Sequence, residues 1–112
     1  MELSIHLTEK NNSLVIHLSG EIDAYTAPQL KERLLPLTKQ NGTLIKVDME
    51  AVQYMDSTGL GVFISALKST KENNSKMKLI HIDERVYRVF KITGLDEIMD
   101  LEPRNKVERR NG

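Results

Sequence analysis

Cysteine and tryptophan are absent from this chain of 112 residues, and aromatic residues of any kind are scarce. Without cysteine the chain can form neither a disulfide nor a thiolate zinc site, which agrees with a reducing environment. Aromatic residues make up 4% of the chain, whereas hydrophobic residues together make up 39%. We therefore expect a single domain with one core built mainly from aliphatic side chains.

A net charge and a long apolar run are also missing. Sixteen basic residues balance sixteen acidic ones, so the overall charge does not favour nucleic acid or an anionic membrane as a partner. No apolar stretch approaches the roughly 18 residues that span a bilayer, and the first residues lack the basic-then-apolar plan of a signal peptide. We expect a cytoplasmic protein that contacts neither nucleic acid nor membrane directly.

Four strands are predicted from the alternation of apolar and polar residues. The first two cover residues 3–8 and 13–19, and the polar pair Asn11-Asn12 between them predicts an antiparallel hairpin. The third strand covers residues 43–49 and the fourth covers residues 76–82.

Three helices are expected between and after these strands. The first begins at Thr26, which can form a capping box with Gln29, and Pro36 is expected to weaken its last turn. The third is expected to begin at Asp83 and to stop at Gly94. The positions predicted to face the core are Ala27, Leu30, Leu34, Leu37, Leu60, Phe63, Ala66, Leu67, Thr70, Val86, Val89 and Phe90.

This order of elements indicates an α/β fold with a mixed β-sheet. The sheet opens with the antiparallel hairpin, and the later strands run parallel through right-handed helical crossovers. Because the strands alternate instead of reading as continuous apolar runs, we expect the helices to pack mainly on one face. The domain is expected to span residues 1–101, and the polar residues 102–112 are expected to form a disordered tail.

The segment from Tyr54 to Gly61, Tyr-Met-Asp-Ser-Thr-Gly-Leu-Gly, lies where the third strand passes into the second helix. Its simplest interpretation is that Asp56 or Ser57 caps the helix, and we expect Ser57 to be the cap. The pair of glycines that follows costs a helix roughly 1 kcal/mol per residue relative to alanine. Small residues beside an exposed hydroxyl indicate that another protein approaches the backbone closely.

Catalytic interpretations of this segment lack the residues that they need. It has no Gly-Lys-Ser/Thr, no dinucleotide glycine spacing, and no glycine before Ser57 as a nucleophile elbow requires. A serine nucleophile also needs a histidine base, and His6, His17 and His81 fall in predicted strands as ordinary sheet-face residues. None is spaced as a metal ligand set. We expect no catalysis, no metal and no cofactor.

Three groups of residues together point to one family. They are Gly20-Glu21-Ile22-Asp23 with Tyr25-Thr26-Ala27-Pro28, then Tyr54-Met55-Asp56-Ser57-Thr58-Gly59-Leu60-Gly61-Val62-Phe63, and Ile92-Thr93-Gly94-Leu95. With them the chain resembles the anti-sigma factor antagonists, which are small STAS domains of bacterial partner-switching modules. It is most similar to the general-stress type called RsbV. The resemblance covers roughly residues 3–101.

The resemblance implies a regulator of transcription that is itself not an enzyme. The unphosphorylated form is expected to bind an anti-sigma factor, which is a serine kinase, so that this kinase releases its sigma factor to direct stress-response transcription. The kinase is expected to phosphorylate Ser57, a PP2C-type phosphatase to remove the phosphate, and Thr58 to be a possible second site. The expected partner-binding residues are Glu21, Asp23, Asp56, Ser57, Thr58, Gly59, Leu60 and Gly61.

Two other functions fit parts of the pattern. A receiver-like domain would use Asp56 as an aspartyl phospho-acceptor, since a short α/β domain with an aspartate after its third strand fits superficially. Such domains, however, need an acidic pair after the first strand and a late lysine, and they open with a helical crossover. A small hydrolase would use Ser57 and would show turnover without a partner.

Overall fold

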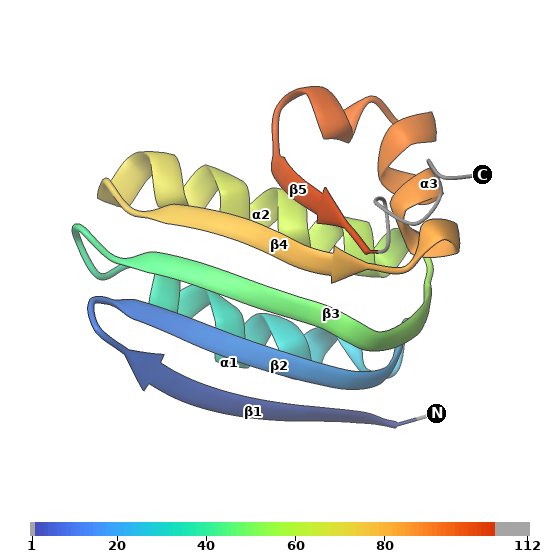
Figure 1. Cartoon of the computed structure of the whole chain (residues 1–112), viewed down its shortest axis with the longest axis horizontal. Coiled ribbons are helices and arrows are strands. Elements are labelled where there is room, and N and C mark those ends of the chain that lie inside the picture. The colour runs from blue at the N-terminus through green and yellow to red at the C-terminus, as the bar shows by residue number, and fades with distance from the viewer. Residues whose placement is uncertain (1, 105–112) are drawn as a thin grey trace.

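A single five-stranded mixed sheet, in the strand order β1-β2-β3-β4-β5, organises the fold (Figure 1). The computed structural model describes residues 2–104. Its elements are β1 (Leu3–Lys10), β2 (Ser13–Ile22), α1 (Ala27–Thr38), β3 (Leu44–Met55), α2 (Ser57–Asn73), β4 (Lys76–Ile82), α3 (Glu84–Ile92), the 3-10 helix η1 (Leu95–Glu97) and β5 (Asp100–Pro103).

The strand directions confirm the predicted mixed sheet. β1 and β2 form the antiparallel hairpin, and its turn contains Asn11 in the left-handed region at φ 55°, where asparagine is tolerated. All later neighbours in the sheet are parallel. The chain therefore makes helical crossovers from β2 onward, as the order of elements predicts.

One face of the sheet holds the core. Helices α1 and α2 lie side by side behind this face in Figure 1, whereas α3 lies at the end of the sheet next to β4. Ile45, Val47 and Met49 of β3 are fully buried on this face, as the alternating pattern predicts. The largest buried side chains are almost all aliphatic, with Phe63 of α2 and Phe90 of α3 as the two aromatic exceptions among the described residues.

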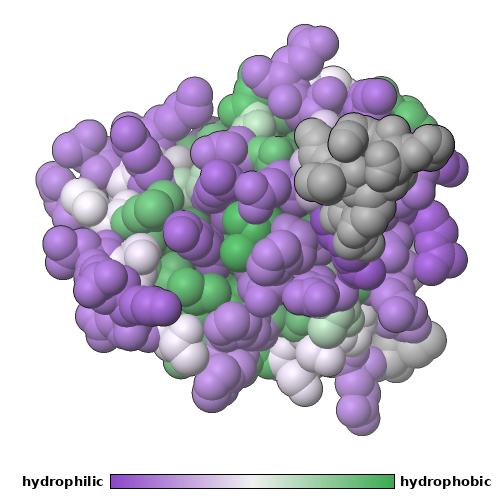
Figure 2. All heavy atoms as spheres, viewed as in Figure 1, coloured by the Kyte–Doolittle hydropathy of each residue, from purple (hydrophilic) through white to green (hydrophobic). Residues whose placement is uncertain are grey.

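The opposite face of the sheet is open to solvent in the described part of the chain. It carries the residues that alternate with the core positions, among them His17 of β2 and the pair Lys46 and Asp48 of β3, which are all half-buried. Figure 2 views this face and shows mostly hydrophilic side chains with small apolar patches between them. The prediction that the helices pack mainly on one face is confirmed.

The capping box predicted for the first helix is wrong. Thr26 stands before α1, but its side chain makes no cap hydrogen bond. Its hydroxyl accepts from the backbone N–H of Asp23 at 2.9 Å and donates to the carbonyl of Glu21 at 2.9 Å. Gln29 donates instead to the carbonyl of Leu3 at 3.0 Å. The threonine is used to close the turn between β2 and α1, so it is not available to the helix.

Other element boundaries differ from the predictions in length. The third strand continues to Met55, well beyond residue 49, and α1 continues through Pro36 to Thr38. Asn74 ends α2 in the left-handed region. The predicted start of the third helix is confirmed, because the Asp83 carboxylate caps α3 by accepting from the Arg85 N–H, and α3 ends at Ile92, two residues before Gly94.

Glu102 and Pro103, which are predicted to belong to the tail, instead form the last residues of β5. The rest of the predicted tail from residue 105 lies outside the described residues.

Candidate functional site

The ends of β2 and β3 meet at one edge of the sheet. Because the two strands are parallel, their pairing places Glu21 beside Tyr54 and Ile22 beside Met55. The backbone N–H of Asp56 then donates to the carbonyl of Ile22 at 3.1 Å. The segments of residues 20–28 and 54–63, which the sequence motifs single out, are therefore neighbours in the fold, and the start of α2 belongs to the second of them.

Asp56 caps α2, so the prediction that Ser57 is the cap is wrong. Asp56 has an extended backbone, and its Oδ1 accepts from the backbone N–H of Thr58 at 3.0 Å and of Gly59 at 3.4 Å. Ser57 is the first residue of the helix. Its side chain is exposed, and no hydrogen bond within residues 2–104 engages its hydroxyl. Capping by Asp56 leaves the serine free for other chemistry.

The Asp56 carboxylate remains an anion beside Ser57 at neutral pH. The hydroxyl of Thr58 donates to Asp56 Oδ1, and this bond, more than any other contact, holds the pKa of Asp56 below its ordinary value of 3.8. Partial burial acts in the opposite direction, but the backbone N–H groups of Thr58 and Gly59 add to the lowering. Thr58 therefore has a structural role here, since its hydroxyl stabilises the charged form of the cap.

Packing within the chain explains why Gly59 of this helix is a glycine, but it does not explain Gly61. A Cβ at Gly59 would lie 2.5 Å from Met55 Cγ and 2.7 Å from Ile22 Cγ2, so the packing of α2 onto the strand ends already requires glycine there. A Cβ at Gly61 would meet nothing within 4 Å, and this residue is exposed. Close approach of another protein to the backbone therefore remains an explanation for Gly61 alone.

The proposed partner-binding residues fall into three groups by exposure. Ser57, Thr58 and Gly61 are exposed, whereas Gly59 and Leu60 are buried in the packing of α2. Glu21, Asp23 and Asp56 are half-buried. Asp23 also holds the turn before α1, because its Oδ1 accepts from the N–H groups of Tyr25 at 2.9 Å and Thr26 at 3.1 Å. Fewer residues are therefore exposed at this edge of the sheet than were expected to bind the partner.

The histidines do not contact Ser57. His17 and His81 each place Nδ1 at 3.0 Å from a carboxylate oxygen of Asp48, on the open face of the sheet. Among the described hydrogen bonds none joins a histidine to Ser57, so the general base that a serine hydrolase needs is not in place. Residue spacing did not predict that these two histidines share one aspartate.

Comparison with known proteins places the chain in a family. A family model described as the STAS domain matches residues 4–109. The protein named anti-sigma-B factor antagonist from Listeria monocytogenes is 42% identical over 103 residues, which cover 91% of this chain and 90% of that protein. The protein of the same name from Bacillus subtilis is 39% identical over 106 residues, which cover 95% and 96%. The chain belongs to the STAS domain family, among its anti-sigma factor antagonists.

Solved structures agree with the STAS fold. A putative anti-sigma factor antagonist from Thermotoga maritima has a TM-score of 0.81 at 22% identity, with 96% of this chain and 92% of that chain covered. The Bacillus cell fate determinant SpoIIAA in its phosphorylated form has a TM-score of 0.66 at 19% identity, with 97% and 100% covered. Within the described part of this STAS domain, no helix is both long enough and apolar enough to cross a membrane.

Three large apolar side chains are exposed within or directly after the two motif segments of this STAS domain, and the predicted site residues did not include them. Tyr25 is 86% exposed, Tyr54 is 49% exposed, and Ile64 is 40% exposed. Ile64 follows Gly61 by three positions, so the two lie on the same face of α2. A hollow lined by Tyr25, Pro28, Gln29, Lys31 and Glu32 adjoins the start of α1. The sequence signal that could have pointed to them is that two of the three tyrosines, Tyr25 and Tyr54, lie within the motifs.

Proposed function

We propose that this STAS domain is an anti-anti-sigma factor controlled by phosphorylation of Ser57. Its unphosphorylated form binds an anti-sigma factor serine kinase in the cytoplasm, the kinase then releases its sigma factor, and stress-response transcription increases. The kinase phosphorylates Ser57 and a PP2C-type phosphatase restores it, while the STAS domain itself catalyses nothing. The observation that carries the proposal is the exposed hydroxyl of Ser57 at the start of α2, which no hydrogen bond from residues 2–104 engages.

The surroundings of Ser57 support a contact surface for a protein partner. Tyrosine and other large side chains that stay exposed next to a small residue are typical of interface centres. Tyr25, Tyr54 and Ile64 provide such side chains here, and Gly61 lets a partner reach the helix backbone. The curated relatives are named for antagonism of an anti-sigma factor, which supports the same partner class.

Physical estimates indicate how the phosphate acts. Phosphorylation adds a charge of about −1.5 to −2 near neutral pH. At a helix N-terminus this charge is favourable by roughly 0.3 to 1 kcal/mol, and the Asp56 anion opposes it, so the fold is retained. Within a close interface the same charge has no such compensation, and a loss of about 3 kcal/mol weakens binding more than 100-fold. The phosphate therefore acts through the partner's surface.

Mass spectrometry and binding measurements test this function together. Wild type incubated with ATP and the cognate kinase should gain one phosphate, and Ser57→Ala should gain none. Ser57→Ala should bind the kinase as wild type does and keep binding it when ATP is present, whereas Ser57→Asp should bind about 100-fold more weakly. Failure of a folded Ser57→Ala variant to bind the kinase would refute the proposal.

The stability of the phosphate in hydroxylamine distinguishes the proposed function from the receiver-like alternative. Asp56 Oδ1 already accepts from Thr58 and Gly59, and the opening hairpin differs from the helical crossover of a receiver. A phosphoserine ester withstands hydroxylamine, whereas an aspartyl phosphate is cleaved by it. Loss of the phosphate in hydroxylamine would assign the modification to Asp56.

A further inference from the structure

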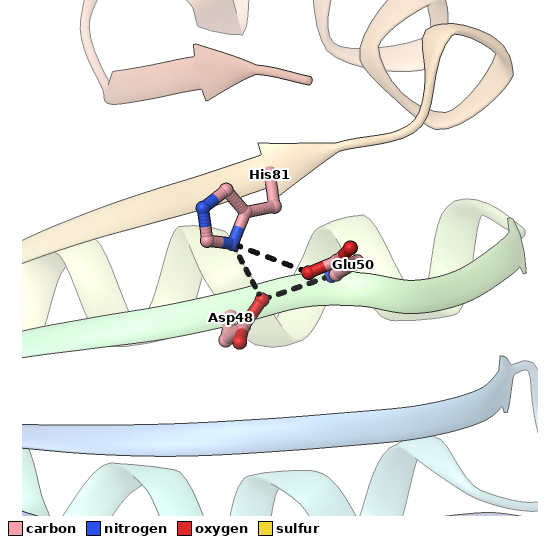
Figure 3. A group of neighbouring side chains, drawn as sticks. All are labelled: Asp48, Glu50 and His81. Atoms are coloured by element: carbon pink, nitrogen blue, oxygen red, sulfur yellow. Dashed lines mark hydrogen bonds and ion pairs between the residues drawn. The ribbon is translucent and has the colours of Figure 1, made fainter. Parts of the chain in front are cut away.

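Three potential metal ligands meet on the open face of the sheet, away from α2. They are Asp48 and Glu50 of β3 and His81 of β4 (Figure 3). His81 Nδ1 lies 3.0 Å from Asp48 Oδ1 and 3.8 Å from Glu50 Oε1, and the three ligand atoms all lie within 4.8 Å of one another. None of these residues takes part in the contact surface described above.

A bulge in β4 brings His81 to this position. Leu79 pairs with Leu101 and Ile82 pairs with Pro103, so β4 has an extra residue at this point. Leu79 and Ile82 are both fully buried, and His81 between them is exposed with φ at 57°. Within residues 2–104 every other positive φ belongs to glycine or asparagine. Histidine in this conformation is uncommon, and such strained residues concentrate at functional sites.

The side chain of Asp48 is fixed from two directions. His17 of β2 places Nδ1 3.0 Å from Oδ2, and Oδ1 accepts from the backbone N–H of Glu50 at 3.1 Å. On the other side of the His17 ring, Nε2 lies 3.4 Å from the Thr8 hydroxyl. Histidine and carboxylate groups outside the ligand set commonly orient metal ligands in this way.

We propose that Asp48, Glu50 and His81 form a binding site for a divalent transition metal ion of the zinc type, with His17 positioning Asp48. An imidazole nitrogen combined with carboxylate oxygens suits zinc and similar ions, whereas magnesium and calcium prefer oxygen ligands alone. Tetrahedral ligands at zinc distances lie about 3.3 Å from one another. The observed 3.0 Å and 3.8 Å bracket this spacing, and the exposed Glu50 side chain can close the longer gap. A fourth position remains for water.

The site is accessible from the open face of the sheet, because the side chains of His81 and Glu50 are 48% and 67% exposed. A hollow of about 310 Å³ lies beside the cluster on this face, and its lining includes His17, Asp48 and Glu50 but not His81.

Calorimetric titration of the untagged full chain with zinc chloride at neutral pH tests the site. We expect saturable binding of one ion per chain that excess magnesium does not displace. Asp48→Asn and His81→Asn should each weaken the affinity for zinc at least about tenfold, because loss of even an outer-shell partner of a metal ligand typically costs roughly 10- to 100-fold in affinity. Asparagine is the chosen replacement at residue 81 because it tolerates the left-handed backbone, and His6→Asn on the same face is the matched control.

Three results would overturn the proposal. They are the absence of saturable zinc binding by wild type, an affinity that Asp48→Asn and His81→Asn leave within twofold of wild type, and displacement of zinc by magnesium. A loss in His6→Asn as large as in His81→Asn would place the ion elsewhere and would also refute it. Kinase binding is not used as a readout, so failure of this test leaves the proposed function of Ser57 unaffected.

Discussion

At the scale of single residues, two adjacent side chains at the start of α2 have separate roles. Asp56 satisfies the free N–H groups of the first turn, and Ser57 faces solvent. From the sequence alone both residues were candidates for the cap, because both types cap helices well, and the expectation that Ser57 is the cap was wrong. Which of them is the cap depends on where β3 ends, and that is set by the burial of Met55 and the Asp56 N–H bond to Ile22. Residue types alone do not contain this information.

The Asp56 cap makes a pH-dependent contribution to stability. The pKa of Asp56 is lower in the folded protein than its ordinary value of 3.8, so the unfolded chain takes up a proton first as the pH falls. The contribution is fully present above the unfolded pKa and is lost as the pH falls through the folded pKa. At pH 7, Asp56→Ala should lower the free energy of unfolding by about 1 kcal/mol, measured by urea denaturation.

Asp56→Asn separates the charge from the cap, because asparagine also caps helices but does not titrate. The stability difference between wild type and Asp56→Asn should shrink as the pH is lowered from 7 to 3. A difference that grows on acidification would contradict the lowered pKa.

At the scale of elements, periodicity predicted the strands and helices better than it predicted their ends. Ile45, Val47 and Met49 alternate cleanly, and their strand was found. β3 continues past residue 49 after its pairing with β2 shifts register, so the alternation that signals a strand is interrupted there. The predicted capping box at Thr26 is absent for a related reason, because the Thr26 hydroxyl is hydrogen-bonded to Asp23 in the turn before the helix. Such competition between local partners is decided by tertiary position.

The two glycines of α2 predict opposite effects of the same substitution. Gly59→Ala places a methyl group against Met55 and Ile22 and should destabilise the fold by about 1 to 3 kcal/mol. Gly61→Ala meets nothing in the chain and should stabilise the helix by up to about 1 kcal/mol. Chemical denaturation of the two variants measures both values.

The same pair tests the contact surface. If a kinase approaches the helix backbone at Gly61, the Gly61→Ala variant should bind the kinase more weakly although it is more stable. Unchanged or tighter binding by Gly61→Ala would remove this residue from the interface and leave its glycine without an explanation.

At the scale of the whole molecule, the one-sided arrangement of helices sets what each face can do. The hairpin and the mixed sheet followed from the order of elements, and the juxtaposition of residues 20–28 with 54–63 follows from parallel pairing of β2 and β3. The meeting of His17, Asp48 and His81 was not predictable from sequence spacing. It depends on the bulge in β4 and on three strands lying side by side, which are properties of the assembled sheet.

Phosphorylation of Ser57 should leave the architecture of the whole domain unchanged. The modified residue is exposed at a helix N-terminus, and the favourable and unfavourable local charge effects are each about 1 kcal/mol or less. Amide NMR spectra of the two forms should therefore differ mainly at residues 54–63 and 20–28, which lie together at the ends of β2 and β3. The free energy of unfolding should change by less than about 1 kcal/mol. Large chemical-shift changes in β1, in β5 or at the far end of α2 would show instead that the phosphate changes the shape of the domain. The partner would then respond to a conformational change and not to the charge of the phosphate.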